Sequence, residues 1–142
     1  MLNLGLFLAT LLALGQVQAA KPHALFVVGT HHYSPHETMP VLASQLDALG
    51  WKTSVLNPGY NPEKNSKGIA GLERLQEADV AIFYTRFLTL PPDQFRLIQL
   101  YLEAGKPVVG FRTSTHAFDY PKDNSLAKWN NGFGSDALGS QY

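Results

Sequence analysis

The chain has 142 residues, of which 11 are Lys or Arg and 11 are Asp or Glu, so its formal net charge is zero. Because the sequence has no basic run that could hold phosphate backbones, nucleic acid is not an expected partner. The sequence contains no cysteine, which excludes disulfides, thiolate metal ligands, a cysteine nucleophile and a lipid-modified cysteine anchor.

The first residues have the pattern of an export signal. Leu4–Leu14 is a nearly continuous apolar run, shorter than the roughly 20 residues that a membrane-spanning helix needs. Val17 and Ala19 occupy the −3 and −1 positions of a cleavage site. We therefore expect residues 1–19 to be a signal peptide for export to the periplasm or the cell exterior, residues 20–142 to form one domain, and no membrane association after cleavage. A buried N-terminal strand or helix is the open alternative, because no Lys or Arg precedes the apolar run.

A strand, a loop and a helix are expected next. Ala24–Gly29 is apolar without alternation, which is typical of a central strand in a parallel sheet. After the loop Thr30–Tyr33, Ser34 is expected to cap a helix, with Pro35 at its first position and Glu37 completing a capping box. The helix is expected to end at Gly50 and to bury Met39, Leu42, Leu46 and Leu49.

The remaining elements continue the alternation of strand and helix. Trp51–Leu56 is a strand of mixed polarity, expected near an edge of the sheet, and Asn57–Gly68 has the turn residues of a loop. Asp79–Tyr84 and Pro107–Phe111 predict two further strands, the last buried on both faces. The helical segments expected between them bury Ile69, Leu72 and Leu75 in a short helix, and Phe95, Ile98, Tyr101 and Leu102 in a longer one that runs from Leu90–Asp93 to Gly105. From Asp119 onwards the sequence no longer shows a clear strand or helix pattern.

This order of elements predicts an α/β fold, a doubly wound three-layer sandwich with a mainly parallel sheet. Right-handed crossovers place the first, third and fourth strands side by side, with the second strand flanking the first. The loops that follow Gly29, Tyr84 and Phe111 then share one edge of the sheet. Ligands of open parallel sheets bind outside the carboxyl ends of the strands, so we expect a site at this edge.

The candidate site residues lie in and beside these three loops. His116 and His32 are the candidate catalytic residues, because imidazole exchanges protons near neutral pH. The candidate ligand contacts are His31, Tyr33, Glu37, Arg86, Arg112, Thr113, Ser114 and Phe118. Guanidinium groups can hold a carboxylate or sugar hydroxyls. Aromatic side chains, namely Tyr33, Tyr84, Phe87 and Phe118, are candidates for an apolar wall.

Each of these interpretations has a structural alternative. His31 and His32 are adjacent, so at most one is expected to face the site. A metal held by histidines would need a third ligand, such as Glu37 or Asp119, and neither a metal nor another cofactor is expected. Ser114 and His116 are two residues apart on a turn with no orienting carboxylate, which argues against a nucleophile–base pair. The arginines could instead pair with Asp79 or Asp119.

Several short segments carry a resemblance to a known family. They are Leu25–Gly29, Tyr33 with Glu37-Thr38, Ala78–Val80, Leu90–Gln94 and, most specifically, Gly105–Thr113 with His116–Phe118. Together they resemble the trehalose-utilisation (ThuA-like) family, a branch of the class I glutamine-amidotransferase-like fold. The resemblance covers roughly Leu25 to the end of the chain. It implies a flavodoxin-like domain and a role in the metabolism of trehalose or a related glycoside.

Two features of the resemblance bear on activity. Trp129, Phe133 and Leu138–Tyr142 look like the next segment of the family, whose members usually continue further, so the resemblance implies a partial copy truncated at its C-terminus. In the amidotransferase parent, a cysteine nucleophile follows the strand that corresponds to Lys106–Phe111. Arg112 occupies that place here, and a protonated guanidinium is not a nucleophile. Glutaminase chemistry is therefore excluded.

Three hypotheses about function remain at this stage. The first is a sugar-processing enzyme that uses His116 and His32, and its expected partner is a small carbohydrate. The second is a non-catalytic sugar-binding or scaffold domain on the same fold. The third is an inactive fragment that lacks groups supplied by a missing segment. The family resemblance alone does not choose among them.

Overall fold

A computed structural model describes residues 19–56 and 68–140 of the chain. The predicted signal peptide, apart from Ala19, and most of the predicted loop Asn57–Gly68 lie outside the described residues. Within the described residues, no helix combines the length and the apolar composition that crossing a bilayer requires.

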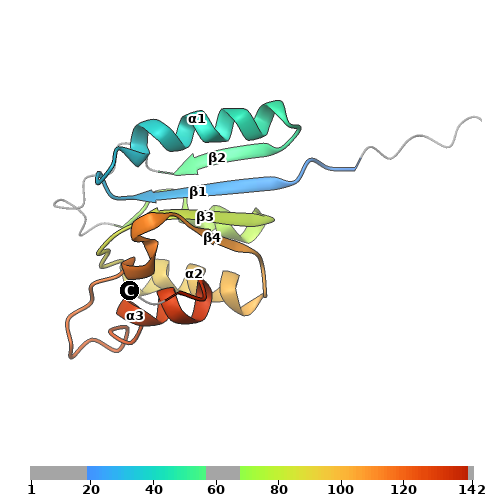
Figure 1. The fold of residues 1–142 in the computed structure, drawn as a ribbon. Coiled ribbons are helices and arrows are strands. Elements are labelled where there is room, and N and C mark those ends of the chain that lie inside the picture. The colour runs from blue at the N-terminus through green and yellow to red at the C-terminus, as the bar shows by residue number, and fades with distance from the viewer. Residues whose placement is uncertain (1–18, 57–67, 141–142) are drawn as a thin grey trace, which may run out of the picture.

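The sheet has the strand order that the sequence predicts. Its strands are β1 (His23–Gly29), β2 (Lys52–Leu56), β3 (Val80–Thr85) and β4 (Val108–Gly110). They are all parallel and lie in the order β2-β1-β3-β4, from top to bottom in Figure 1. The carboxyl ends of β1, β3 and β4 therefore meet at one edge, as expected.

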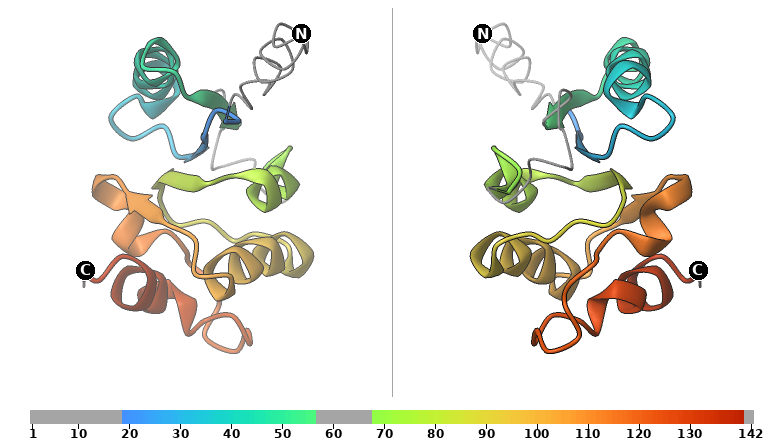
Figure 2. Two further views of the ribbon diagram at one scale, coloured as in Figure 1. Left: turned by 90° about the vertical axis from the view of Figure 1, so that its right-hand side faces the viewer. Right: turned by 90° about the vertical axis from the view of Figure 1, so that its left-hand side faces the viewer.

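Helices cover both faces of the sheet. Figure 2 looks along the strands and shows α1 (Pro35–Ala48) on one side, with η2 (Leu72–Glu77) and α2 (Pro92–Glu103) on the other. Alternate residues of β1 follow this division, because Phe26 packs in the cluster with α1 whereas Leu25 packs in the cluster with η2 and α2. The doubly wound three-layer α/β architecture is thus confirmed.

The segment after β4 is more ordered than its composition suggests. It forms a 3₁₀ helix η3 (Arg112–His116), a one-turn α3 (Trp129–Gly132) and a π-helical turn η4 (Phe133–Ala137). Phe133 is fully buried and meets Phe83 of β3 edge-on, with ring centroids 5.2 Å apart. The C-terminal segment therefore belongs to the core on the α2 side of the sheet.

The predicted capping box at the start of α1 is wrong. Ser34 precedes the helix with φ 52°, and its side chain makes no capping hydrogen bond. Its carbonyl instead accepts from the backbone N–H of Glu37 at 3.0 Å and from that of Thr38 at 3.1 Å. An N-cap hydroxyl reaches the helix only from extended backbone, and the left-handed conformation of Ser34 removes that possibility.

The predicted buried face of α1 is partly wrong. Met39 is buried and Leu42 and Leu46 are half-buried, but Leu49 is 77% exposed. The helix ends at Ala48, so Leu49 already lies beyond its last turn. Gly50 follows with φ 93°, the left-handed conformation expected of a glycine that stops a helix.

The prediction that the fourth strand is buried on both faces is also wrong. β4 pairs only with β3 and has three residues, and Val109 is 45% exposed. The apolar cluster beneath α1 contains residues of β1, β2 and β3 together with Phe111, but not Val109. An apolar run without alternation predicts a strand, but it does not show whether a helix reaches far enough to cover it.

Phe95 of α2 is the centre of an aromatic cluster. It is fully buried, and its ring meets those of Phe118 at 5.0 Å, Trp129 at 5.3 Å and Tyr120 at 5.8 Å between centroids. These contacts join α2 to three points of the chain after η3. Edge-to-face aromatic pairs add to the stabilisation that burial supplies.

Replacing Phe95 with Ala is expected to lower the free energy of unfolding by about 3–5 kcal/mol, because the change removes a buried ring and leaves a cavity. Leu49→Ala, at the exposed position, is the matched control and is expected to change it by less than about 0.5 kcal/mol. Urea unfolding followed by circular dichroism measures both. Equal losses in the two variants would contradict this description of the core.

A buried polar cluster lies at the amino end of β1. His23 is 3% exposed, and its Nε2 lies 2.9 Å from the hydroxyl of Ser54, which also accepts a 2.5 Å hydrogen bond from Arg74. Burial lowers the pKa of His23, and the nearby charges of Lys52 and Arg74 lower it further. Protonation of this imidazole is therefore unfavourable in the folded protein.

The stability of the protein should consequently depend on pH through His23. Its pKa is depressed from the usual 6.5 only in the folded state, so the unfolded chain binds more protons and stability falls as the pH drops below that value. His23→Gln keeps a hydrogen-bonding partner for Ser54 but does not titrate. Urea unfolding between about pH 7 and pH 5 should show a shallower loss in this variant than in the parent. If the stability of the parent and of His23→Gln falls equally with pH, the pH dependence does not come from His23.

Candidate functional site

An open pocket of about 440 Å³ lies at the carboxyl edge of the sheet. The loop after β1, the loop after β3 and the helix η3 after β4 supply its side chains. These are His32, Tyr33, Arg86, Arg112, Thr113 and His116, all of them predicted site residues. The fold thus brings together residues that lie up to 84 positions apart (His32 to His116) in the sequence.

Arg86 is held by two neighbours. Its Nη1 lies 2.9 Å from Nε2 of His32, and its guanidinium carbon lies 4.1 Å from the ring centroid of Phe87. A guanidinium can only donate hydrogen bonds, so Nε2 of His32 accepts and the imidazole proton must be on Nδ1.

Arg112 is held in a similar way by Tyr33. Its Nη2 donates to the phenol oxygen of Tyr33 at 3.1 Å, and its guanidinium carbon lies 4.0 Å from the centroid of the same ring. Tyr33 is 60% exposed, so the stacked pair stands at the mouth of the pocket. Both pocket arginines thus lie over aromatic rings, an arrangement that stabilises a guanidinium and restricts its orientation.

Backbone strain is concentrated around this pocket. In the part of the chain that the structure describes, the non-glycine residues with positive φ are Tyr33 (66°), Ser34 (52°), Phe87 (51°) and Arg112 (34°). The left-handed conformation costs a non-glycine residue about 1–2 kcal/mol. Tyr33 and Arg112 line the pocket, and the other two adjoin lining residues. Strain of this kind persists where the surrounding structure enforces it, which is common at binding sites.

His116 is the most enclosed of the histidines in the pocket. Its Nδ1 lies 3.4 Å from the hydroxyl of Thr115, and its ring lies 5.1 Å from that of Phe87. Burial lowers the pKa of His116, and the positive charge of Arg86 lowers it further. At neutral pH this imidazole is therefore neutral and able to accept a proton.

Ser114 does not line the pocket, so its prediction as a ligand contact is wrong. It is fully buried, and its hydroxyl donates to the carbonyl of Phe83 at 2.9 Å and accepts from the N–H of Thr85 at 3.1 Å. Thr113 does line the pocket, but its hydroxyl donates to the carbonyl of Thr85 at 2.9 Å. The two hydroxyls attach η3 to the end of β3.

Three other candidates also lie outside the pocket lining. Phe118 is 2% exposed and packs on Phe95 and Phe133, so its place in a ligand wall is wrong. The ring of His31 lies 4.7 Å from that of His36, and of the two adjacent histidines it is His32 that lines the pocket. Glu37 is exposed beside His36.

The aromatic wall differs from the expected one. Tyr84 is buried and stacks on Phe111, with ring centroids 6.1 Å apart, so it faces the interior. Tyr33 and Phe87 are the exposed aromatics of this edge, and both lie beneath arginines. Phe87 was expected in the aromatic wall because it follows Arg86 in the loop after the third strand. Its positive φ could not be predicted from the sequence, because Gly or Asn usually occupies such a position.

Among the residues that the structure describes, 19–56 and 68–140, none that lines the pocket has a carboxylate. Asp79, an expected partner of the arginines, instead accepts a 2.7 Å hydrogen bond from the N–H of His23 at the opposite end of β1. Among the described residues, no group of three or more His, Asp or Glu is arranged to hold a metal ion. The chemistry available in the pocket is hydrogen-bond donation by two fixed guanidiniums beside two imidazoles.

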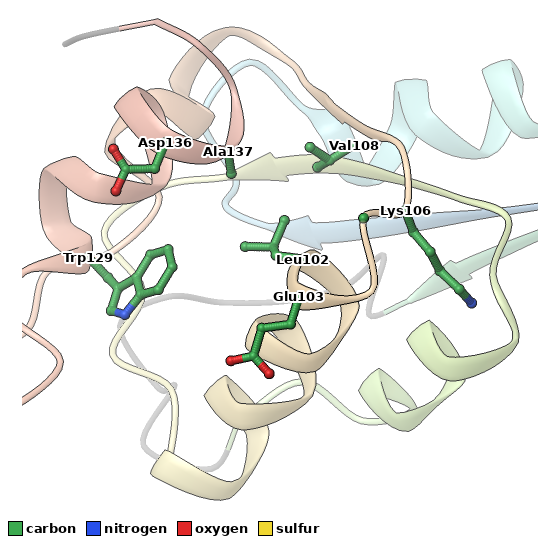
Figure 3. A pocket seen from close by; sticks show the side chains of 8 residues that line it. Leu102, Glu103, Lys106, Val108, Trp129, Asp136 and Ala137 are labelled. Carbon is green, nitrogen blue, oxygen red and sulfur yellow. The ribbon is translucent and has the colours of Figure 1, made fainter.

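A second pocket of about 400 Å³ has a different character. Figure 3 shows Leu102, Val108 and Trp129 around it, with the carboxylates of Glu103 and Asp136 at its side. The ammonium of Lys106 turns away from it and donates to the carbonyls of Gln76 and Ala78 at 2.9 Å each. It contains no histidine and lies away from the convergent strand ends, so the carboxyl-edge pocket is the stronger candidate for function.

Comparisons of this chain with protein-family models, with curated proteins and with solved structures found no match. The class of the protein therefore follows from its own geometry. It is an α/β protein with a parallel sheet and an arginine- and histidine-lined pocket at the carboxyl ends of three strands. Open parallel sheets bind their ligands in this place.

Ser114→Ala should destabilise the protein by about 1–3 kcal/mol, because it leaves the buried N–H of Thr85 without a partner. Ser44→Ala, at an exposed position of α1, is the control and should change stability by less than about 0.5 kcal/mol. Denaturant unfolding compares the two. If Ser114→Ala has the same free energy of unfolding as the parent, the hydroxyl of Ser114 does not hold η3 in place.

Proposed function

We propose that this chain is an exported ThuA-like domain that binds a small carbohydrate ligand, trehalose or a related glycoside or sugar derivative. The observation that carries the proposal is the convergence of His32, Arg86, Arg112 and His116 on one open pocket at the strand ends. Its volume of about 440 Å³ suits a small molecule. The resemblance through Gly105–Thr113 supports the carbohydrate link, and the leader-like residues 1–19 support export.

The arrangement favours binding over covalent catalysis. Arg112 lies two residues after the end of β4, where a nucleophile would be placed, and the hydroxyl of the buried Ser114 is bonded to backbone groups. Neither side chain can attack a substrate. The donors that the pocket holds can bind the oxygen atoms of a ligand without any covalent step.

Acid–base catalysis is the second candidate, and one observation favours it. The pKa of His116 is lowered by burial and by Arg86, so its imidazole is neutral at physiological pH, as a general base must be. His32 is the second candidate, and its Nε2 already accepts from Arg86. The domain would then be a sugar-processing enzyme in which His116 moves the proton.

The binding proposal can be tested with the full-length chain and a panel of neutral and acidic mono- and disaccharides, with trehalose included. We expect at least one sugar to shift the imidazole NMR signals of His32 and His116 on titration. Tyr33→Ala removes an exposed ring at the mouth of the pocket and should weaken that ligand about tenfold, the equivalent of about 1.4 kcal/mol.

Val41→Ala is the control, because Val41 is an exposed apolar residue of α1 that does not line the pocket. It should bind the ligand like the parent. Absence of binding across the panel, or equal affinity in parent and Tyr33→Ala, would refute the proposed site. If the parent converts a bound sugar to product and His116→Gln binds the sugar without converting it, the sugar-processing enzyme is the better description.

A further inference from the structure

We infer that the ligand of the carboxyl-edge pocket carries an oxyanion, a carboxylate or phosphate group on a sugar-like body, and that Arg86 and Arg112 bind it. The inference rests on the proposed function and adds the charge of the ligand. The described residues that line the pocket supply two guanidiniums and two imidazoles, and none of them is acidic.

The two pocket arginines have no acidic partner in the described part of the chain. Among residues 19–56 and 68–140, neither guanidinium forms an ion pair with a carboxylate, and the ion-pair contacts found are His36–Glu37 and Arg96–Glu103. Arg86 donates to the imidazole of His32 and Arg112 to the phenol oxygen of Tyr33. A guanidinium has five N–H donors. Donors therefore remain on both groups for a ligand.

The two guanidiniums are already held in place by aromatic rings before a ligand binds. Each guanidinium lies about 4 Å from the centroid of an aromatic ring, and each ring belongs to a residue held at positive φ, Tyr33 or Phe87. Stacking covers the face of a guanidinium and leaves its N–H groups in the plane free to donate. A planar fork of donors matches the two oxygens of a carboxylate or phosphate. Because the side chains are already ordered, binding costs less entropy.

The charges of the described lining residues are positive and are not balanced within the pocket. The charge of Arg86 acts on His116, whose pKa it lowers in addition to the effect of burial. None of the lining residues in the described part of the chain has a negative charge that would offset this field. Charges gathered in a cleft with walls of low dielectric concentrate ligands of opposite sign. An oxyanion would supply the missing negative charge.

A neutral sugar fits the pocket less well. Each of its hydroxyls both donates and accepts, so a neutral polyol needs acceptors as well as donors. The clear acceptors of the pocket are few, because Nε2 of His32 accepts from Arg86 and the oxygen of Tyr33 accepts from Arg112. The hydroxyl of Thr113 donates to the backbone of Thr85. Donors exceed acceptors, which favours a ligand that mainly accepts.

The test compares glucuronate and glucose 6-phosphate with glucose, and with acetate and inorganic phosphate alone, by titration calorimetry on the full-length chain. We expect at least one acidic sugar to bind tenfold or more tightly than glucose, because hydrogen bonds to charged groups are stronger than those to neutral ones. Arg86→Gln and Arg112→Gln should each remove most of that advantage. The preferred acid distinguishes a carboxylate ligand from a phosphate ligand, and either preference supports the inference.

Arg96→Gln is the matched control, because it removes the same charge from an exposed position of α2 that pairs with Glu103. It should retain the preference for acidic sugars, and circular dichroism verifies that all variants are folded. Equal binding of glucose and both acidic sugars would overturn the inference and leave the proposed function standing. Acetate or phosphate binding as tightly as the acidic sugars would support an oxyanion site but refute a sugar ligand. Failure of every probe to bind would overturn both.

Discussion

The hydroxyl of Ser114 joins two parts of the chain on which the pocket depends. It donates to the carbonyl of Phe83 and accepts from the N–H of Thr85, so η3 is attached to the last residues of β3. β3 and β4 pair over only three residues, from Ala81 opposite Val108 to Phe83 opposite Gly110. The buried hydroxyl continues this connection past the end of the strands, at a place where backbone pairing alone has stopped. The positions of Arg112 and His116, on either side of Ser114, follow from it.

The pocket combines strain with fixed charge. Left-handed backbone at Tyr33, Phe87 and Arg112 costs free energy, and it turns the two aromatic rings beneath the two guanidiniums. The charge of Arg86 also disfavours protonation of His116. The strained backbone is unfavourable for folding, and the two guanidiniums that it accompanies are the groups that would bind the proposed oxyanion. This opposition between stability and site geometry is what we expect where a fold has been adapted to bind.

Where sequence reasoning failed, the reason was a property that a local pattern does not encode. Ser34 has the residue type of a helix cap, but its backbone is left-handed, so its hydroxyl cannot reach the helix. Leu49 continues the apolar spacing of α1 one step beyond the end of the helix and is exposed. Ser114 and Phe118 lie in the segment where site residues were expected, yet both side chains turn into the interior. The direction of a side chain after a turn depends on φ and on the contacts available, and composition reports neither.

Sequence alone determined the parallel order of the strands, the absence of thiol chemistry and the edge at which polar loops converge. These properties follow from hydrophobic periodicity, from composition and from the handedness of crossovers, all of which are local or general rules. Tertiary structure decided which of the candidate residues face the pocket, that the arginines lie over Tyr33 and Phe87, and that none of the described residues lining the cavity is acidic. Those facts depend on contacts between residues far apart in the chain, such as Arg112 with Tyr33 and Arg86 with His32, which form only when the sheet has brought the strand ends together.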